Sequence, residues 1–240
     1  MKKIAVIACV HGNEQYGLEV IKLLPSSFSF FIANKKAIEQ KKRFIDTDLN
    51  RCFPGKKEGN NEEKIAYGLA NVLNEFDEVL DLHSTSEACP LFGIITKPDN
   101  EKIMLAKRLG LQKLVIMSPD YASGKALIDF VKKGISLEVG PHERKENVEE
   151  AVDAIKALVE GCGAKETSLE IYEVFDIIRG ENKKPLIGNF DEVKEGQPIA
   201  VSPDKSTQKA PFDFIAVLVG EKSYNDVVCL ACRKGRQSWR

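Results

Sequence analysis

Val6-Ile7-Ala8-Cys9-Val10-His11-Gly12-Asn13-Glu14 is the stretch from which the architecture of this 240-residue chain can be worked outward. The apolar, β-branched run over residues 4–10 predicts a buried parallel strand. Gly12 and Asn13 turn the chain, and the segment after them has the spacing of a helix, with one apolar face formed by Leu18, Ile21 and Leu24. A strand that passes directly into a helix is typical of an α/β sheet.

His11 and Glu14 stand where this strand passes into the helix, at the edge where α/β sheets bind ligands. An imidazole and a carboxylate three residues apart suit Zn²⁺, although Glu14 alone could simply be an acid at a helix N-terminus. His83 follows a second predicted strand, residues 78–82, and Asp81 on the same strand face could orient its imidazole. The pattern therefore predicts a metal site formed by His11, Glu14 and His83.

The amino-acid composition indicates which classes of protein this chain can belong to. Hydrophobic residues make up 43% and charged residues 30% of the chain, as in ordinary globular proteins. A formal net charge of -1 gives no electrostatic basis for binding nucleic acid. No apolar run is long enough to cross a bilayer, and the short N-terminal run predicts a strand and no secretion signal, so we expect no membrane association and a cytoplasmic protein.

Six cysteines show no spacing typical of a disulfide-rich secreted protein. Cys229 and Cys232 form a C-x-x-C without a second pair, and in a strand their thiols would point to opposite faces, so buried structural thiols are expected. Thiol catalysis by Cys9 or Cys52 is a weaker alternative. His142 could assist it, but this histidine is expected at the surface after Pro141.

Strands and helices alternate in the first two thirds of the chain. Beyond the first strand and helix, we expect strands over residues 28–33, 78–82, 91–96, 114–117 and 134–141, and helices over residues 61–76, 99–109 and 146–159. The pattern changes at Gly161-Cys162-Gly163, after which short strands are expected over residues 169–178, 186–190, 197–202, 212–219 and 227–232. The chain therefore predicts an α/β domain over residues 1–163 and a small all-β domain over residues 164–240.

A polar loop and a buried acidic residue could also take part in binding or catalysis. Residues 43–55 are dense in polar side chains and end in Pro54-Gly55, which predicts a loop. Its two arginines and Asn50 could form a carboxylate-binding fork, and a solvated turn is the alternative. Glu138 lies inside an apolar strand, where an unpaired charge is costly. It is therefore expected beside a cation or protonated, either in a structural salt bridge or as a general base.

Four motifs occur in a familiar order: His11-x-x-Glu14, Asp48-Leu49-Asn50-Arg51 with Phe53-Pro54-Gly55, Asp81-Leu82-His83-Ser84-Thr85, and Glu138-Val139-Gly140-Pro141. Together they resemble the succinylglutamate desuccinylase/aspartoacylase family, which is related to the zinc carboxypeptidases. The resemblance covers the chain to about Pro141. It implies a zinc-carboxypeptidase-like domain with a central mixed sheet flanked by helices. It also implies that the small C-terminal β domain caps the active-site cleft.

The resemblance also implies roles for individual residues. One Zn²⁺ per chain would be held by His11, Glu14 and His83, with a fourth position left for water. Glu138 would take the proton of that water and return it to the leaving amine, and Arg43 would polarise the scissile carbonyl. The remaining implied roles are substrate carboxylate binding by Asn50 and Arg51, loop support by Asp48, and a substrate contact from Tyr224.

The implied activity is that of a zinc-dependent amidohydrolase whose partner is a small N-acyl amino acid. The alternatives are a zinc carboxypeptidase acting on a small peptide or cell-wall fragment, and a metal-binding protein without catalysis. One departure concerns specificity: aspartoacylases carry a substrate-binding arginine and a tyrosine where this chain has Ile128 and Gly124. The acyl amino acid is therefore left open, N-acetylaspartate in particular, as is the oligomeric state, a homo-oligomer included.

Overall fold

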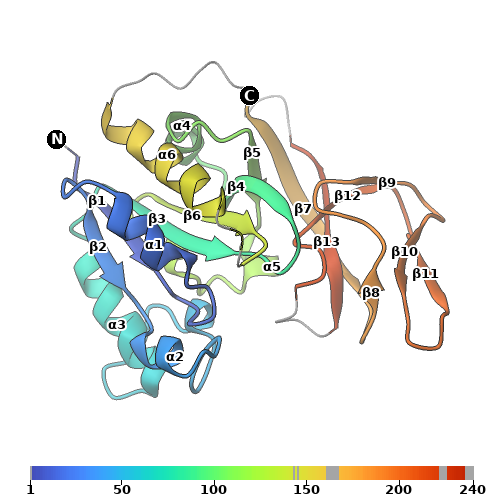
Figure 1. Ribbon diagram of the computed structural model, residues 1–240, viewed down its shortest axis with the longest axis horizontal. Helices are drawn as coiled ribbons and strands as arrows, with labels where there is room; N and C mark the ends of the chain where they lie inside the picture. The colour runs from blue at the N-terminus through green and yellow to red at the C-terminus, as the bar shows by residue number, and fades with distance from the viewer. Residues whose placement is uncertain (1, 143, 145, 161–167, 222–225, 236–240) are drawn as a thin grey trace.

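The computed structural model describes the whole chain except residues 1, 143, 145, 161–167, 222–225 and 236–240. Its centre is a ten-stranded mixed sheet in the order β2-β1-β3-β6-β4-β5-β7-β13-β12-β9 (Figure 1). Helices flank this sheet, and a second sheet of three strands, β11-β10-β8, lies at the end remote from the helices. The expected α/β class with a central mixed sheet is confirmed.

The elements have the following bounds. The strands of the first two thirds are β1 Ile4–Ala8, β2 Ser29–Ile32, β3 Glu78–Ser84, β4 Cys89–Ile95, β5 Lys113–Ile116 and β6 Gly134–Gly140. The later strands are β7 Glu170–Arg179, β8 Lys184–Pro185, β9 Glu192–Val193, β10 Pro198–Val201, β11 Thr207–Lys209, β12 Phe214–Val217 and β13 Val227–Lys234. The helices are α1 Tyr16–Leu23, α2 Lys35–Glu39, α3 Asn61–Leu73, α4 Asn100–Arg108, α5 Pro119–Ala122 and α6 Glu146–Glu160, with 3-10 turns η1 Leu49–Arg51 and η2 Leu127–Asp129.

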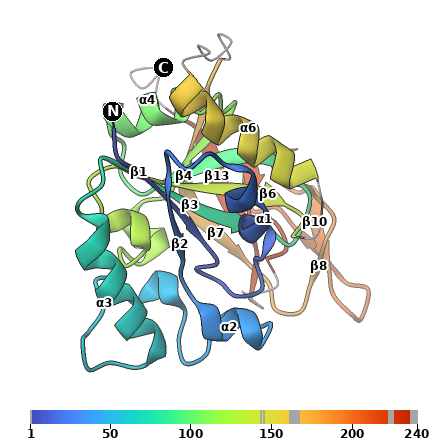
Figure 2. The same cartoon turned by 60° about the vertical axis from the view of Figure 1, so that its left-hand side comes forward.

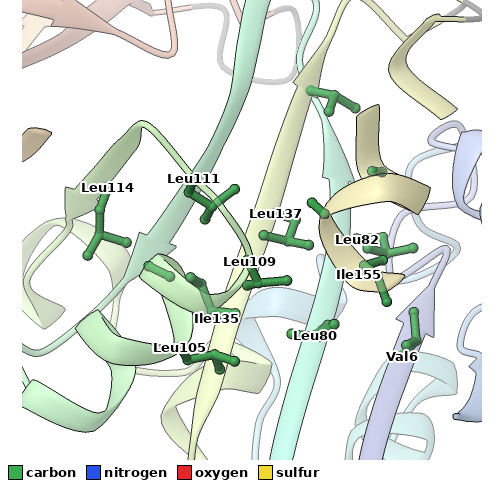
Figure 3. Close-up of a cluster of buried hydrophobic side chains, with 14 of the residues drawn as sticks. Val6, Leu80, Leu82, Leu105, Leu109, Leu111, Leu114, Ile135, Leu137 and Ile155 are labelled. Atoms are coloured by element: carbon green, nitrogen blue, oxygen red, sulfur yellow. The ribbon is translucent and has the colours of Figure 1, made fainter. Parts of the chain in front are cut away.

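Strand β1 is buried on both faces, as its unbroken apolar run predicts. Ile4 and Val6 pack into a core shared with α1, α4 and α6, whereas Ala5 and Ile7 pack into a core shared with α3. Figure 2 shows α4 and α6 on one side of the sheet and α2 and α3 on the other. Figure 3 shows the first core, where side chains of β3 and β6 meet those of α4 and α6.

The register of the parallel strands aligns their carboxyl ends. Strand β1 is parallel to β3, and β3 is parallel to β6, with His83 opposite Glu138. The loops that follow β1, β3 and β6 therefore meet at one edge of the sheet. Strand β4 is antiparallel to β6 and brings its start, Cys89, to the same edge opposite Gly140.

The C-terminal strands continue the central sheet. Strand β7 is parallel to β5, and β13, β12 and β9 follow it in antiparallel order. The described residues after position 168 form strands and turns and no helix. The division proposed at residue 163 lies outside the described residues. None of the helices in the described part of the chain combines the length and the apolar composition of a bilayer span.

Cys229 and Cys232 lie in two different hydrophobic clusters, as expected for thiols on opposite faces of a strand. The five cysteines that the structure describes are free, and burial raises the pKa of the Cys229 thiol to about 12. Both residues are fully buried, so they serve as packing residues.

One expected strand is wrong, and one helix was not predicted. Residues 186–190 do not form a strand, because a turn intervenes in which Asp191 accepts a hydrogen bond from the Gly188 N–H and Phe190 adopts a φ of 68°. Only the two-residue strands β8 and β9 flank it. Helix α2 was not expected, because five residues are too few to show a helical period, and the Asn34 side chain that caps it lies in a polar segment.

Glu78 lies at the sheet edge opposite the site, and its fully buried side chain meets several cations. Its Oε1 atom lies 2.5 Å from Lys2 Nζ, 2.7 Å from Arg108 Nη1 and 3.9 Å from Lys133 Nζ. Burial disfavours the ionised form, but hydrogen bonds from Lys2 and Arg108 outweigh it and lower the pKa of this carboxyl. The ionised group therefore stabilises the fold above the pKa that it has in the unfolded chain, about 4.3.

We expect Glu78→Gln to lower the free energy of unfolding at pH 7 by about 1.5–3 kcal/mol, the range for hydrogen bonds to charged groups. The wild type should lose this contribution as the pH falls below about 4.3 through the lowered native pKa, so the two proteins should converge in acid. Urea unfolding at pH 7, 5, 4 and 3 measures both effects. The exposed Glu75→Gln serves as the control, and parallel pH curves for wild type and Glu78→Gln would contradict the assignment.

Candidate active site

The chain reverses direction directly after β1. The strand ends at Ala8, two residues earlier than expected, because Cys9 adopts a left-handed φ of 58°. Gly12 follows in close contact with α2, where a Cβ atom would lie 2.2 Å from the Ala37 carbonyl carbon. Its N–H donates to the Arg43 carbonyl at 3.1 Å. Only glycine fits here, and the turn is thereby held against the arginine loop.

His11, Glu14 and His83 converge at this edge and are all buried. Glu14 Oε1 lies 2.8 Å from His11 Nδ1, and Glu14 Oε2 lies 3.0 Å from His83 Nδ1. One ligand atom from each residue lies within 4.8 Å of the other two. The structure thus brings the three predicted metal ligands together, and the group could hold an ion.

A second carboxylate contacts the other nitrogen, Nε2, of each imidazole. Asp48 Oδ1 lies 3.1 Å from His11 Nε2, and Asp81 Oδ2 lies 2.8 Å from His83 Nε2. Because an ionised carboxylate only accepts hydrogen bonds, these contacts fit either a doubly protonated imidazole or one with its proton at Nε2 and its Nδ1 lone pair facing Glu14. Two lone pairs facing a carboxylate repel it unless a cation or a proton lies between them. The donor set therefore fits a dication.

The electrostatics of the cluster lead to the same conclusion. Burial alone would lower the pKa of His83, but the carboxylates of Asp81 and Glu14 raise it well above its usual range. Burial would raise the pKa of Glu14, yet the two histidines lower it well below its usual range. The carboxylates therefore favour a positive charge beside the His83 ring, which a proton supplies when no metal is bound. A metal ion would replace that proton, because its ligands are neutral histidine and ionised carboxylate.

Arg43 joins this cluster to the polar loop. Its Nη1 donates to Glu14 Oε1 at 3.2 Å, while Nε and Nη2 donate to Asp48 Oδ2 at 3.2 Å. Burial opposes ionisation of Asp48, but its hydrogen bond to His11 and the nearby arginines hold its pKa well below the usual range. Asp48 therefore does more than support the loop, because it contacts His11 and Arg43 at once.

Glu62 fixes the path of this loop, and sequence reasoning missed it. Its fully buried carboxylate accepts hydrogen bonds from three consecutive backbone N–H groups, those of Ile45, Asp46 and Thr47. The local sequence does not reveal this role, because an acidic residue in the first turn of a helix ordinarily interacts with the helix N-terminus. Its partners lie 15 to 17 positions away in the sequence.

Asn50 and Arg51 line the same cavity as the cluster. The Leu127 N–H donates to Asn50 Oδ1 at 3.0 Å, which fixes the orientation of the amide. The Asn50 Nδ2 atom lies 3.1 Å from His83 Nε2, which is also 2.8 Å from Asp81 Oδ2. Arg51 Nη1 donates to the Asn50 carbonyl at 2.9 Å.

Glu138 stands beside the cluster on β6, directly opposite His83 of β3. It lines the cavity, which has a volume of about 100 Å³, and it has no hydrogen-bond partner among the described residues. Burial raises the pKa of Glu138 to about 8, and the charges of Glu14 and Glu221 act in the same direction. The site therefore holds a carboxyl group whose proton affinity is suited to exchange near neutral pH.

Other residues of the site were not expected or cannot be placed. His142, expected at the surface, is partly buried, and its Nδ1 lies 2.7 Å from Ser84 Oγ. Glu221 lines the cavity and accepts hydrogen bonds from the Ser86 N–H and hydroxyl. Neither contact has a sequence signal, because each joins loops from distant parts of the chain. Tyr224 lies outside the described residues.

Comparison with known proteins gives concordant results. The model of the succinylglutamate desuccinylase/aspartoacylase catalytic domain matches residues 1–162. A probable aspartoacylase of Trichodesmium erythraeum is 31% identical over 166 residues, which cover 59% of this chain and 56% of that protein. An N-acyl-aromatic-L-amino acid amidohydrolase (carboxylate-forming) B of Danio rerio is 26% identical over 170 residues, which cover 58% and 54%. The chain thus spans about half the length of the curated relatives that it matches.

Solved structures share the fold over nearly the whole chain. Murine aminoacylase 3 aligns with a TM-score of 0.81 at 20% identity, covering 98% of this chain and 95% of that one. A succinylglutamate desuccinylase/aspartoacylase from Rhodobacter sphaeroides aligns with a TM-score of 0.78 at 17% identity, covering 99% and 86%. The family match covers well over half of the sequence and includes the residues of the cluster. This chain belongs to the succinylglutamate desuccinylase/aspartoacylase family.

Proposed function

We propose that this chain is a zinc-dependent amidohydrolase that cleaves the amide bond of a small N-acyl amino acid. One observation carries the proposal. The Nδ1 atoms of His11 and His83 converge on Glu14 beside Glu138, a carboxyl group that has no hydrogen-bond partner among the described residues. Three metal-binding groups beside a carboxyl of raised pKa are the parts needed for hydrolysis with an activated water.

The metal would be held by His11 Nδ1, His83 Nδ1 and Glu14. Two imidazoles and one carboxylate suit zinc better than the harder divalent ions, and three protein ligands are typical of catalytic zinc sites. When bound, zinc supplies Lewis acidity, which polarises an amide carbonyl and makes water more acidic. Asp48 and Asp81 would hold the two imidazoles in the required tautomer.

The protein side chains would perform the proton transfers and bind the substrate. Glu138 would accept a proton from the attacking water and then donate it to the nitrogen of the leaving amine. Arg43 would donate to the carbonyl oxygen as negative charge develops on it, a contribution typically worth roughly 3–4 kcal/mol. Asn50 and Arg51 would bind the α-carboxylate of the amino acid, because an amide N–H and a guanidinium together match its two oxygens.

The size and lining of the cavity favour a small substrate. Its volume is about 100 Å³, and Leu218 and Glu221, which follow β12, form part of its wall. We propose that the chain divides into an α/β domain over residues 1–163 and a β domain over residues 164–240 that caps the cleft. This arrangement favours an acyl amino acid over the peptide or cell-wall fragment that an open carboxypeptidase cleft would accept.

Zinc analysis and a substrate screen test the proposal together. We expect about one zinc per chain, release of amine from N-acetyl amino acids, loss of activity with a chelator and recovery when zinc is added back. Dipeptides and tripeptides form the comparison set. Hydrolysis of these peptides without hydrolysis of any N-acyl amino acid would favour the carboxypeptidase alternative. Bound zinc without either activity would indicate a metal-binding protein that does not catalyse the reaction.

A further inference from the structure

The cavity lining combines polar and apolar side chains. Its apolar residues, called the apolar wall below, are Ile94, Met117, Ala126, Ile128 and Leu218. We infer that the amino acid released by this protein has an uncharged, apolar side chain, which lies against this apolar wall. The inference rests on the proposed function, because it concerns the substrate of that same site.

The apolar wall begins beside the proposed catalytic carboxyl. Ile94 of β4 pairs with Ser136 of β6, two residues from the pair formed by Phe92 and Glu138. Side chains two residues apart on a strand share one face of the sheet, so Ile94 and Glu138 project from the same face. Ile94 is 6% exposed, which makes it a close-packed part of the wall.

The position of η2 identifies which part of the substrate meets this wall. Asn50, assigned to the α-carboxylate, is bonded through Oδ1 to the Leu127 N–H, and Ile128 is the next residue. The side chain of an amino acid branches from the same carbon as its α-carboxylate. We therefore place the side chain of a substrate held at Asn50 against Ile128, which is 2% exposed and belongs to the wall.

The charges of the cavity favour one substrate carboxylate and disfavour a second. Among the lining residues that the structure describes, the cations other than the two histidines are Arg43 and Arg51. Arg43 already contacts the carboxylates of Glu14 and Asp48, and the proposed function assigns Arg51 to the α-carboxylate. Glu221 adds a further acidic group to the lining. A carboxylate in the substrate side chain would therefore be desolvated without a described cation beside it, which is strongly unfavourable.

A matched set of substrates tests this inference in the zinc-loaded wild type. N-acetyl derivatives of leucine, asparagine and aspartate have side chains of nearly the same shape that differ in polarity and charge. We expect kcat/KM for the leucine derivative to exceed that for the aspartate derivative by at least about 100-fold, with asparagine between them. Equal or better cleavage of the aspartate derivative would overturn the inference and leave the proposed amidohydrolase function intact.

The variant Ile128→Arg tests the assigned position. A guanidinium at this point of the wall would supply a cation for a side-chain carboxylate, so the leucine-to-aspartate ratio should fall by about 100-fold or more. Met104→Arg introduces the same group at an exposed position on α4 and should leave the ratio unchanged. An unchanged ratio in a folded Ile128→Arg protein would show that the side chain lies elsewhere.

Failure of the proposed function remains distinguishable from failure of the inference. If zinc is bound and neither these three derivatives nor any other N-acyl amino acid of the screen is cleaved, the proposed activity is wrong. Calorimetric binding of the same three compounds to the zinc-loaded protein then decides the preference directly. Tighter binding of the leucine derivative would support the apolar wall as a binding site, and tighter binding of the aspartate derivative would overturn it.

Discussion

Replacing Glu138 with glutamine should leave the zinc content unchanged and lower kcat by roughly 10²- to 10⁴-fold, with little change in KM. The amide has the shape of the carboxyl group but cannot accept and return a proton. Glu138 is not one of the three predicted metal ligands and has no hydrogen-bond partner among the described residues, so its replacement should leave the rest of the site in place. Steady-state kinetics and zinc analysis of the same preparation measure both parts.

The pH profile adds a second test of this role. Burial raises the pKa of Glu138 to about 8, and a bound dication would lower it again by favouring the ionised form. Activity should therefore rise with pH as the carboxyl loses its proton, and this limb should be absent from the residual activity of Glu138→Gln. The exposed Glu150→Gln is the control. Wild-type turnover in Glu138→Gln would mean that another group transfers the proton.

Replacing His83 with alanine should abolish zinc binding at micromolar metal and, with it, the activity. The variant removes one of three ligands, so the loss should exceed the roughly 10- to 100-fold that follows from removing an outer partner of a metal ligand. Asp81→Asn provides that comparison, because it keeps His83 and changes only the carboxylate whose Oδ2 lies 2.8 Å from His83 Nε2. Competition with a chromogenic chelator measures the affinity of both variants.

The fold of each variant must be followed separately, because His83 is buried between two carboxylates. Removal of the imidazole leaves Glu14 and Asp81 without a common partner, which destabilises the site even without metal. Thermal unfolding in the presence of a chelator separates this effect from metal loss. Retention of zinc by a folded His83→Ala protein, or equal affinity of Asp81→Asn and wild type, would contradict the proposed ligand set.

The convergence of the metal ligands could be predicted from the sequence because of a regular property of α/β sheets. Apolar runs end at His11 and His83, and the carboxyl ends of neighbouring parallel strands lie at the same edge. Glu138 could be identified as a candidate because an acidic residue inside an apolar strand is costly unless a cation pairs with it or it is protonated. These inferences need only the local sequence pattern and the general geometry of parallel strands.

The contacts that hold the loop of residues 43–55 could not be predicted. Glu62 and Leu127 bond to this loop from other parts of the chain, and Asp48 of the loop contacts His11. These hydrogen bonds depend on the complete tertiary arrangement. The contact between His142 and Ser84 could not be predicted for the same reason, because the two residues are 58 positions apart. The pairing of β7 with β5 was also hidden, since a change of local pattern near residue 163 does not show which strands will pair across it.

The pairing of β7 with β5 makes the C-terminal strands part of the folding unit. Leu114, Val115 and Ile116 of β5 are buried, with β4 on one side and β7 on the other. A fragment made only of the residues that match the family model would leave the far edge of β5 open and apolar, a form that readily pairs with other chains and aggregates. We therefore expect the C-terminal strands to protect the first 162 residues from self-association, in addition to supplying part of the cavity lining through the segment after β12.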